Sequence, residues 1–294
     1  MSQSSEITNV AEPTEGSEPA NAETTQPNPN APKKSVVREY LESFIVTLIM
    51  AFFGMTFIVQ AVTVPTGSMQ NTIYIGDHFL VNKFIYGPGT PLPFLPMREV
   101  RRGDIVVFKY PGNRVNPAAD RSRDLKPYEI NYIKRVIGLP GDTVEFRNNQ
   151  VYINGQLLPE RRVIGDVVPA RGSNPEKVSL TIKEFEPAPP DAAYTVYYDS
   201  ENVEEAKRGM SVVEGRGMNF GVAGKPSVVP PDSYFMMGDA RDNSEDSRYW
   251  GFVHRDLIIG RAMFVYWSCD QSQSDTFIGC LTSPRFNRIG ALIK

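Results

Sequence analysis

Histidine and cysteine, which often act as catalytic bases, nucleophiles or metal ligands, are scarce in this 294-residue sequence. The chain has two histidines, His78 and His254, and two cysteines, Cys269 and Cys280, with neither an HExxH nor a CxxC motif. Zinc chemistry and a histidine-based catalytic triad are therefore disfavoured, and we expect neither a metal nor a cofactor. A serine nucleophile in this chain would need a different base, and a buried lysine is the next candidate.

Ser68 is the first candidate nucleophile. It lies in the sequence VPTGSM at residues 64–69, directly after a long apolar run, which would place its hydroxyl near a membrane surface. The same Pro-Thr-Gly-Ser sequence also describes an ordinary turn. Ser68 is not part of a GxSxG elbow, and no serine in the chain is followed three positions later by lysine, so two common serine-enzyme motifs are excluded.

Lys134 is the candidate base. It lies in YIKRVIGLPGD at residues 132–142, where Ile133, Val136 and Ile137 would help to exclude water. Exclusion of water disfavours the ammonium form and lowers the pKa of the amine. The alternative is an ordinary lysine that points to solvent from the edge of a strand.

A third segment is dense in short polar side chains. It reads GDARDNSEDSRYWG at residues 238–251. Such a segment is either a solvated turn or a set of groups that hold a catalytic amine by hydrogen bonds and one another by ion pairs.

An apolar run would have to anchor these groups. The chain carries no charge from Ser43 to Val64, and a helix of this length would rise about 33 Å, enough to cross a hydrocarbon core of about 30 Å. A cleaved signal sequence and a buried core helix are the alternatives. Lys33, Lys34 and Arg38 precede the run, which predicts a cytoplasmic N-terminus and an external remainder.

The remainder predicts strands rather than helices. Residues 104–110 and 143–147 are rich in β-branched and aromatic types, and residues 151–153 follow an Asn-Asn-Gln turn that predicts a hairpin. Residues 1–32 are acidic and contain no Lys, Arg or aromatic residue, which predicts a disordered tail. The chain has 31 basic and 34 acidic residues, a balance that argues against a nucleic-acid partner.

Together with GDIVVFKYP at residues 103–111, the three segments resemble the motifs of the type I signal peptidases, in the same order. The resemblance covers roughly residues 40–155 and 232–267. It implies a membrane-bound serine endopeptidase that removes N-terminal signal peptides with a Ser–Lys dyad. The implied fold is mainly β, a signal-peptidase-like β-sheet catalytic domain with an inserted β-containing subdomain, preceded by one transmembrane helix.

The expected domains follow from this resemblance and from the composition of the chain. They are an acidic cytoplasmic tail (1–36), a transmembrane anchor (37–64), a catalytic β-domain (65–155 and 232–268), an inserted subdomain (156–231) and a C-terminal segment (269–294).

The resemblance also implies roles for individual residues. Ser68 would be the nucleophile and Lys134 the general base, while the Thr66 hydroxyl and the Ser68 backbone N–H would form the oxyanion hole. Thr66 stands where the family often has serine, and it keeps the hydroxyl. Ser244 would orient Lys134 by a hydrogen bond. The supporting network of ion pairs would consist of Arg135, Asp239, Asp246 and Arg248.

The substrate would lie as an added strand, with small side chains in shallow pockets one and three residues before the cut. By resemblance the pockets are lined by Val64, Pro65, Met69, Ile73, Tyr132 and Ile133. The apolar loop at 84–97 would either dip into lipid or form a buried hairpin tip. Signal peptides of preproteins, membrane lipid and the translocation machinery are the expected partners. The expected location is the plasma (inner) membrane.

Three questions stay open at the level of sequence. Cys269 and Cys280 either form a disulfide, as an oxidising compartment would favour, or remain free thiols. A self-cleaving Ser–Lys protease of the repressor type is the nearest alternative enzyme, although it lacks a membrane span. A membrane-tethered β-domain that only binds peptides is the non-catalytic alternative.

Overall fold

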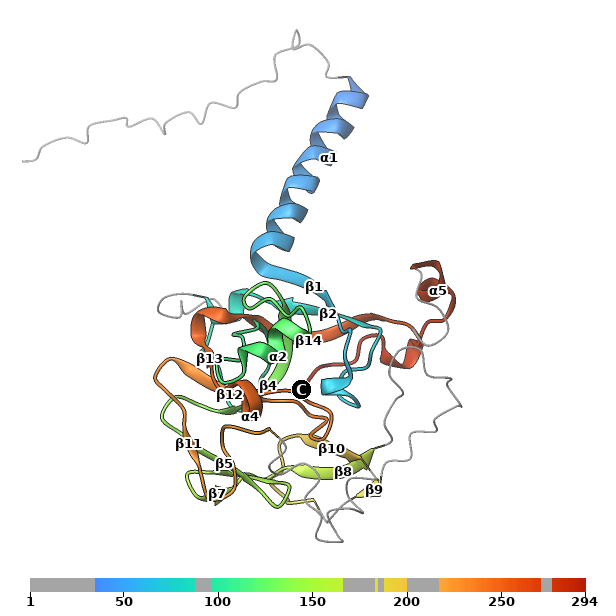
Figure 1. Cartoon of the computed structure of the whole chain (residues 1–294). Helices are drawn as coiled ribbons and strands as arrows, with labels where there is room; N and C mark the ends of the chain where they lie inside the picture. The colour runs from blue at the N-terminus through green and yellow to red at the C-terminus, as the bar shows by residue number, and fades with distance from the viewer. Residues whose placement is uncertain (1–34, 88–96, 166–182, 185–187, 200–216, 271–276) are drawn as a thin grey trace, which may run out of the picture. The chain divides into compact units, whose positions relative to one another are not determined.

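The computed structural model describes residues 35–87, 97–165, 183–184, 188–199, 217–270 and 277–294 (Figure 1). The chain divides into two compact units, Met1–Leu48 and Ile49–Lys294. The predicted acidic tail lies almost entirely outside the described residues, as do the centre of the apolar loop at 84–97 and much of the predicted insert.

The apolar run forms a helix that is shorter than predicted at its C-terminal end. Helix α1 spans Val36–Phe53 and continues as a π-helical turn, η1, over Gly54–Ile58. Among the described residues, this helix alone is long and apolar enough to cross a membrane. Its predicted end at Val64 is wrong, because Val59–Thr63 form strand β1. β-branched residues suit a strand as well as a membrane helix, so hydropathy does not mark the change.

The second unit is built on a seven-stranded antiparallel sheet in the order β1-β2-β14-β3-β4-β12-β13. Strand β1 is an edge strand and continues directly into the segment that carries Ser68 (Figure 1). The strand at 104–110 is confirmed as β3. The strands span β1 Val59–Thr63, β2 Asp77–Asn82, β3 Ile105–Lys109, β4 Asn131–Gly138, β12 Ser233–Met237, β13 Val253–His254 and β14 Ile258–Ser268.

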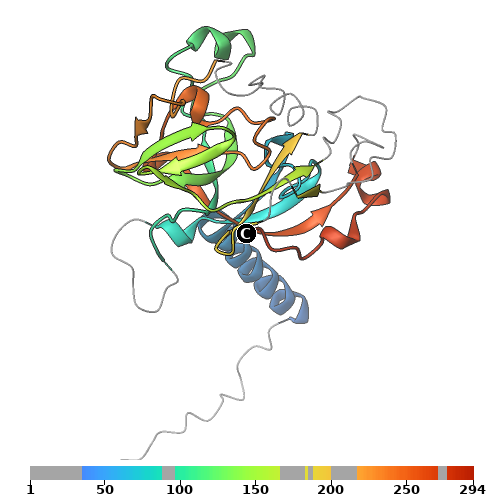
Figure 2. The same ribbon diagram turned by 90° about the horizontal axis from the view of Figure 1, so that it is seen from below.

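Two small sheets adjoin the large one in sequence and lie at the end of this unit that faces the viewer in Figure 2. The first has four antiparallel strands and contains the predicted hairpin, whose loop residues Asn148 and Asn149 have positive φ. Asparagine tolerates this conformation better than most residues. The strands are β11 Ser227–Val228, β5 Thr143–Arg147, β6 Gln150–Ile153 and β7 Gln156–Leu157.

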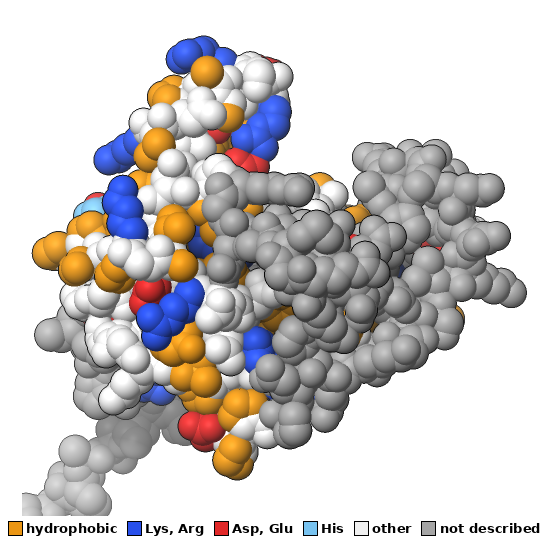
Figure 3. All heavy atoms as spheres, turned by 60° about the horizontal axis from the view of Figure 1, so that its bottom comes forward, with side chains coloured by type: hydrophobic (Ala, Val, Ile, Leu, Met, Phe, Trp, Pro, Cys, Tyr) orange, Lys and Arg blue, Asp and Glu red, His pale blue; other side chains and the backbone are white. Residues whose placement is uncertain are grey.

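The second small sheet belongs to the predicted insert. Strands β10 and β8 pair in parallel, and β8 pairs antiparallel with β9. Figure 3 shows the surface of the molecule with the lower end of Figure 1 turned forward. On this face, hydrophobic, basic and acidic side chains of the described residues are interspersed. The ends of the predicted insert, β7 and β11, instead complete the four-stranded sheet, so the insert boundaries at 156 and 231 cut through that sheet. The three strands are β8 Arg161–Gly165, β9 Lys183–Glu184 and β10 Thr195–Asp199.

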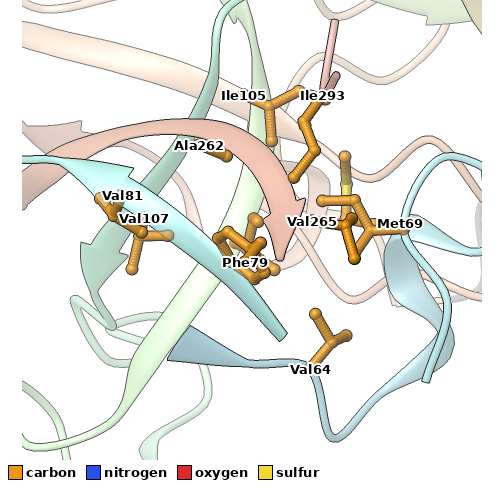
Figure 4. Close-up of a cluster of buried hydrophobic side chains, with 11 residues drawn as sticks. Val64, Met69, Phe79, Val81, Ile105, Val107, Ala262, Val265 and Ile293 are labelled. Carbon is orange, nitrogen blue, oxygen red and sulfur yellow. The ribbon is translucent and has the colours of Figure 1, made fainter. Parts of the chain in front are cut away.

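The C-terminal segment packs into the main core and is not a separate addition. Ile293 is buried in the cluster that joins the sheet to the Ser68 segment (Figure 4). Arg288 pairs with the buried carboxylate of Asp77 on β2, at 2.6 Å. Cys269 and Cys280 form a disulfide, which connects the end of β14 to α5.

Short helical turns complete the described chain. They are η2 Gly67–Met69, η3 Phe84–Tyr86, α2 Pro117–Ser122, α4 Ser247–Trp250, η4 Arg255–Leu257, α5 Phe277–Thr282 and η5 Phe286–Arg288.

Candidate active site

Ser68 is held by core residues on either side of it in the chain. Val64 and Met69 are buried in the cluster shown in Figure 4, together with Phe79 on β2 and Val265 on β14. Ser68 lies in the short helix η2 and is itself 8% exposed. Anchoring on both sides fixes the backbone of Ser68, so that its hydroxyl points in a defined direction.

Lys134 reaches Ser68 from the middle of the sheet. It lies on β4 opposite Val106 of β3 and is 4% exposed. Its Nζ atom donates a hydrogen bond to Ser68 Oγ at 2.5 Å, although the two residues are far apart in sequence. The structure therefore brings together the two residues that the sequence predicted as nucleophile and base.

Burial of the Lys134 side chain lowers the pKa of its amine from 10.5 to about 8. Removal from water is the largest cause, since a buried ammonium loses its hydration. The negative charges of Asp246 and Glu245 act in the opposite direction, and Arg248 lowers the pKa further. About a tenth of a group with this pKa is neutral at pH 7.

The predicted ion pairs form directly beside the dyad. Arg135 donates two hydrogen bonds to Asp239, at 2.7 and 2.6 Å, and Arg248 donates two to Asp246, both at 2.8 Å. Burial alone would raise the pKa of Asp246, but Arg248, with smaller contributions from the Gly238 N–H and Lys134, lowers the pKa below its usual value. All four side chains are buried, and bidentate pairs of this kind fix orientation.

Ser244 lies beside the dyad without the predicted hydrogen bond to Lys134. The residue is 6% exposed, and its hydroxyl has no hydrogen-bond partner among the described residues. A Cβ on Gly238 would lie 2.2 Å from Ser244 Oγ and 2.4 Å from the Ser68 carbonyl oxygen. Only glycine fits there, and this close approach places Ser244 next to the backbone of Ser68.

The predicted oxyanion donor and pocket residues divide into exposed and buried groups. Thr66 and Pro65 are exposed and Tyr132 is half-buried. Thr66 has an extended backbone. The other four pocket candidates belong to the same buried cluster, namely Val64, Met69, Ile73 and Ile133.

Several contacts at this site were not predicted. The Ala240 backbone N–H donates to the Ser68 carbonyl at 3.2 Å. The Thr72 hydroxyl donates to Asp239 at 2.6 Å. Arg241 pairs with Glu160, which lies 81 positions earlier in the chain. Backbone contacts and long-range ion pairs leave no local pattern in a sequence, so only the density of polar residues at 238–251 pointed to them.

Comparison with known proteins identifies the family of this chain. The family model described as "Signal peptidase, peptidase S26" matches residues 37–267. The signal peptidase I of Buchnera aphidicola subsp. Acyrthosiphon pisum is 31% identical, over 88% of this chain and 83% of that protein. The signal peptidase I of Aquifex aeolicus is 32% identical, over 79% and 84%. A crystal structure of a signal peptidase I from Enterococcus faecalis is 27% identical and covers 56% of this chain and 97% of that chain, with a TM-score of 0.29.

Proposed function

Since this chain belongs to the signal peptidase family, peptidase S26, we propose that it removes signal peptides from preproteins with Ser68 as nucleophile and Lys134 as general base. The observation that carries the assignment of the dyad is the buried hydrogen bond between Lys134 Nζ and Ser68 Oγ, at 2.5 Å. A base has to lie within hydrogen-bond reach of the proton it removes, and this pair meets that requirement.

The reaction proceeds in two halves. The neutral Lys134 amine takes the proton of the Ser68 hydroxyl as Oγ attacks the scissile carbonyl, and a tetrahedral oxyanion forms. The resulting ammonium then donates that proton to the leaving amine, which gives the acyl-enzyme and frees the mature protein. Water attacks the acyl-enzyme with Lys134 again acting as base, and the signal peptide is released.

The polar groups around the dyad have supporting roles in this proposal. The Thr66 hydroxyl and the Ser68 backbone N–H donate to the oxyanion, where charge develops during the reaction. Ser244 is proposed to orient the Lys134 amine by a hydrogen bond. This role stays a prediction, because the Ser244 hydroxyl makes no hydrogen bond to Lys134 in the structure. The two bidentate ion pairs keep the polar segment at residues 238–251 and strand β4 in place. Their members are Arg135, Asp239, Asp246 and Arg248.

The pockets beside the dyad are proposed to accept small side chains. Val64, Met69, Ile73 and Ile133 are packed in the core, so they can form the floor of a shallow pocket but not of a deep one. Exposed Pro65 and half-buried Tyr132 would form its rim. A signal peptide with bulky residues at the cut would then overlap with this floor.

The function is tested with the solubilised full-length chain, a preprotein and N-terminal sequencing of the product. We expect one cut, after a small residue. Thr66→Ala should cut at the same place but about 100-fold more slowly, because one oxyanion donor is lost. Thr66→Ser, the matched control, should cut at nearly the wild-type rate.

Other outcomes of the same assay would contradict the proposal. Binding of the preprotein without cleavage would favour a tethered peptide-binding domain, and cleavage of the chain itself alone would favour a self-cleaving protease. Undiminished turnover in Thr66→Ala would show that the Thr66 hydroxyl is not an oxyanion donor.

The orientation in the membrane is a separate proposal. Basic residues before the uncharged run that starts at Ser43, including Arg38, and their absence after it until Lys83 support an N-terminus inside the cell and a β-domain outside. This places Ser68 where preproteins emerge, so contact with lipid and with the translocation machinery is expected.

Protease added to sealed spheroplasts checks this orientation. We expect the chain after the helix to be degraded and the N-terminal tail to be protected, with antibodies against each end reporting the two outcomes. In permeabilised spheroplasts both ends should be lost. Protection of the β-domain in sealed spheroplasts would reverse the proposed orientation.

A further inference from the structure

The turn at residues 238–242 touches the nucleophile through its backbone. The Ala240 N–H donates to the Ser68 carbonyl at 3.2 Å. Gly238 approaches the same carbonyl so closely that a Cβ there would lie 2.4 Å from the oxygen. The position of this turn therefore determines where the backbone of Ser68 lies relative to Lys134.

The other side of this turn pairs with the second small sheet. The Tyr197 N–H on β10 donates to the Asp239 carbonyl at 2.8 Å, and the Arg241 N–H donates to the Tyr197 carbonyl at 2.9 Å. Residues Tyr197 and Ala240 thus form a parallel bridge. The sheet of the insert is extended by the turn, and the turn is held between that sheet and Ser68.

A buried ion pair fastens the same junction. Arg241 donates to Glu160, which directly precedes β8, at 2.8 and 2.5 Å, and both side chains are at most 2% exposed. Glu160 also accepts from the Tyr194 hydroxyl at 2.8 Å. The Arg241 Nε atom donates back to the Gly238 carbonyl at 3.2 Å. One guanidinium therefore links the insert to Gly238, which lies against the Ser68 carbonyl.

We infer that Glu160 and Arg241 are positioning residues, which hold Ser68 against Lys134 by fixing the turn at 238–242. This inference rests on the proposed roles of Ser68 and Lys134 and extends them to the insert. Neither side chain touches the dyad, so the effect passes through the Ala240 and Gly238 backbone contacts. The described strands of the insert then support the nucleophile.

If the pair only stabilised the fold, a folded variant without it would keep the kcat of the wild type. Replacement of a buried ion pair by apolar residues of similar volume is often neutral for stability, whereas removal of one partner leaves an uncompensated buried charge. Single substitutions at Glu160 or Arg241 therefore report mainly on folding. The double variant Glu160→Leu, Arg241→Met removes both charges and isolates the effect on the turn.

The test compares this double variant with the wild type in the preprotein assay, after circular dichroism and thermal melting have shown that it is folded. We expect kcat to fall roughly 10- to 100-fold while KM stays within about 3-fold, since a small displacement of a reacting group affects the transition state more than binding. The matched control is Glu145→Leu, Arg147→Met, which removes an ion pair of 3.2 Å from β5 in the other small sheet. It should leave kcat unchanged.

Two results would overturn the inference. One is a folded Glu160→Leu, Arg241→Met variant with the kcat of the wild type, and the other is a rise in KM with kcat unchanged. The parallel Ser68→Ala variant separates this failure from failure of the proposed function. If Ser68→Ala still cleaves, the dyad is wrong; if it is inactive while the double variant is fully active, only the positioning role is wrong.

Discussion

Replacement of Lys134 by arginine should reduce cleavage by about 10⁴-fold or more, comparable to the loss of a member of a catalytic triad. The guanidinium keeps the positive charge but stays protonated at any pH that the protein tolerates. It therefore cannot take the proton of the Ser68 hydroxyl, which lies 2.5 Å from the Lys134 amine. The measurement is single-turnover cleavage of a preprotein by the solubilised variant.

Lys109→Arg provides the matched control. Lys109 lies on the neighbouring strand β3 and donates to the Glu129 carbonyl, away from any proposed step. This variant should cleave at the wild-type rate, while Ser68→Ala should be as inactive as Lys134→Arg. A Lys134→Arg enzyme that is folded and retains a tenth of wild-type activity would rule out Lys134 as the base.

The rate of cleavage should rise with pH along one limb with an apparent pKa of about 8. The amine acts only when neutral, and burial lowers the pKa of Lys134 to about this value. Below pH 8 the neutral fraction falls tenfold for each unit, so kcat/KM should increase about 1,000-fold between pH 5 and pH 9. A variant with both His78 and His254 replaced by glutamine should keep this limb. Its disappearance with the histidines would assign the base to one of them.

Stability offers a second readout of the same amine. The folded pKa of Lys134 lies below its unfolded value, so the unfolded chain binds more protons between about pH 8 and pH 10 and the free energy of unfolding rises with pH in that window. The full shift corresponds to about 3 kcal/mol. Lys134→Met should lose this rise. The same rise in wild type and variant would show that another group is responsible.

The sequence was informative about strands and less so about boundaries. β-branched residues between turn signals predicted β3, β5 and β6, because alternation and turn chemistry are local properties. The end of the apolar helix was predicted six residues too late, since Val59–Thr63 carry no charge and therefore continue the uncharged run. Only the pairing of β1 with β2 identifies this segment as a strand, and pairing partners are not visible in composition.

The site was predictable where short motifs encode it and not where distant segments meet. Ser68 and Lys134 were found from their motifs, and the structure places them in hydrogen-bond contact. The pair Glu160–Arg241 was not found, because a glutamate in an irregular Pro-rich segment carries no local mark of its partner. The role of Ser244 in orienting Lys134 was predicted from the polar segment at 238–251. The hydrogen bonding of its hydroxyl, however, depends on side-chain geometry that the sequence does not specify.

The direct continuation of the helix into strand β1 limits how the enzyme meets its substrates. Ser68 follows Ile58 by about ten residues, and an extended chain spans at most about 3.5 Å per residue, so the nucleophile lies within roughly 35 Å of the end of the helix. Once that helix is embedded in a bilayer, the search for substrate is confined to two dimensions. The rate then depends on the number of preproteins per unit area of membrane, and dilution of the surrounding solution leaves it unchanged.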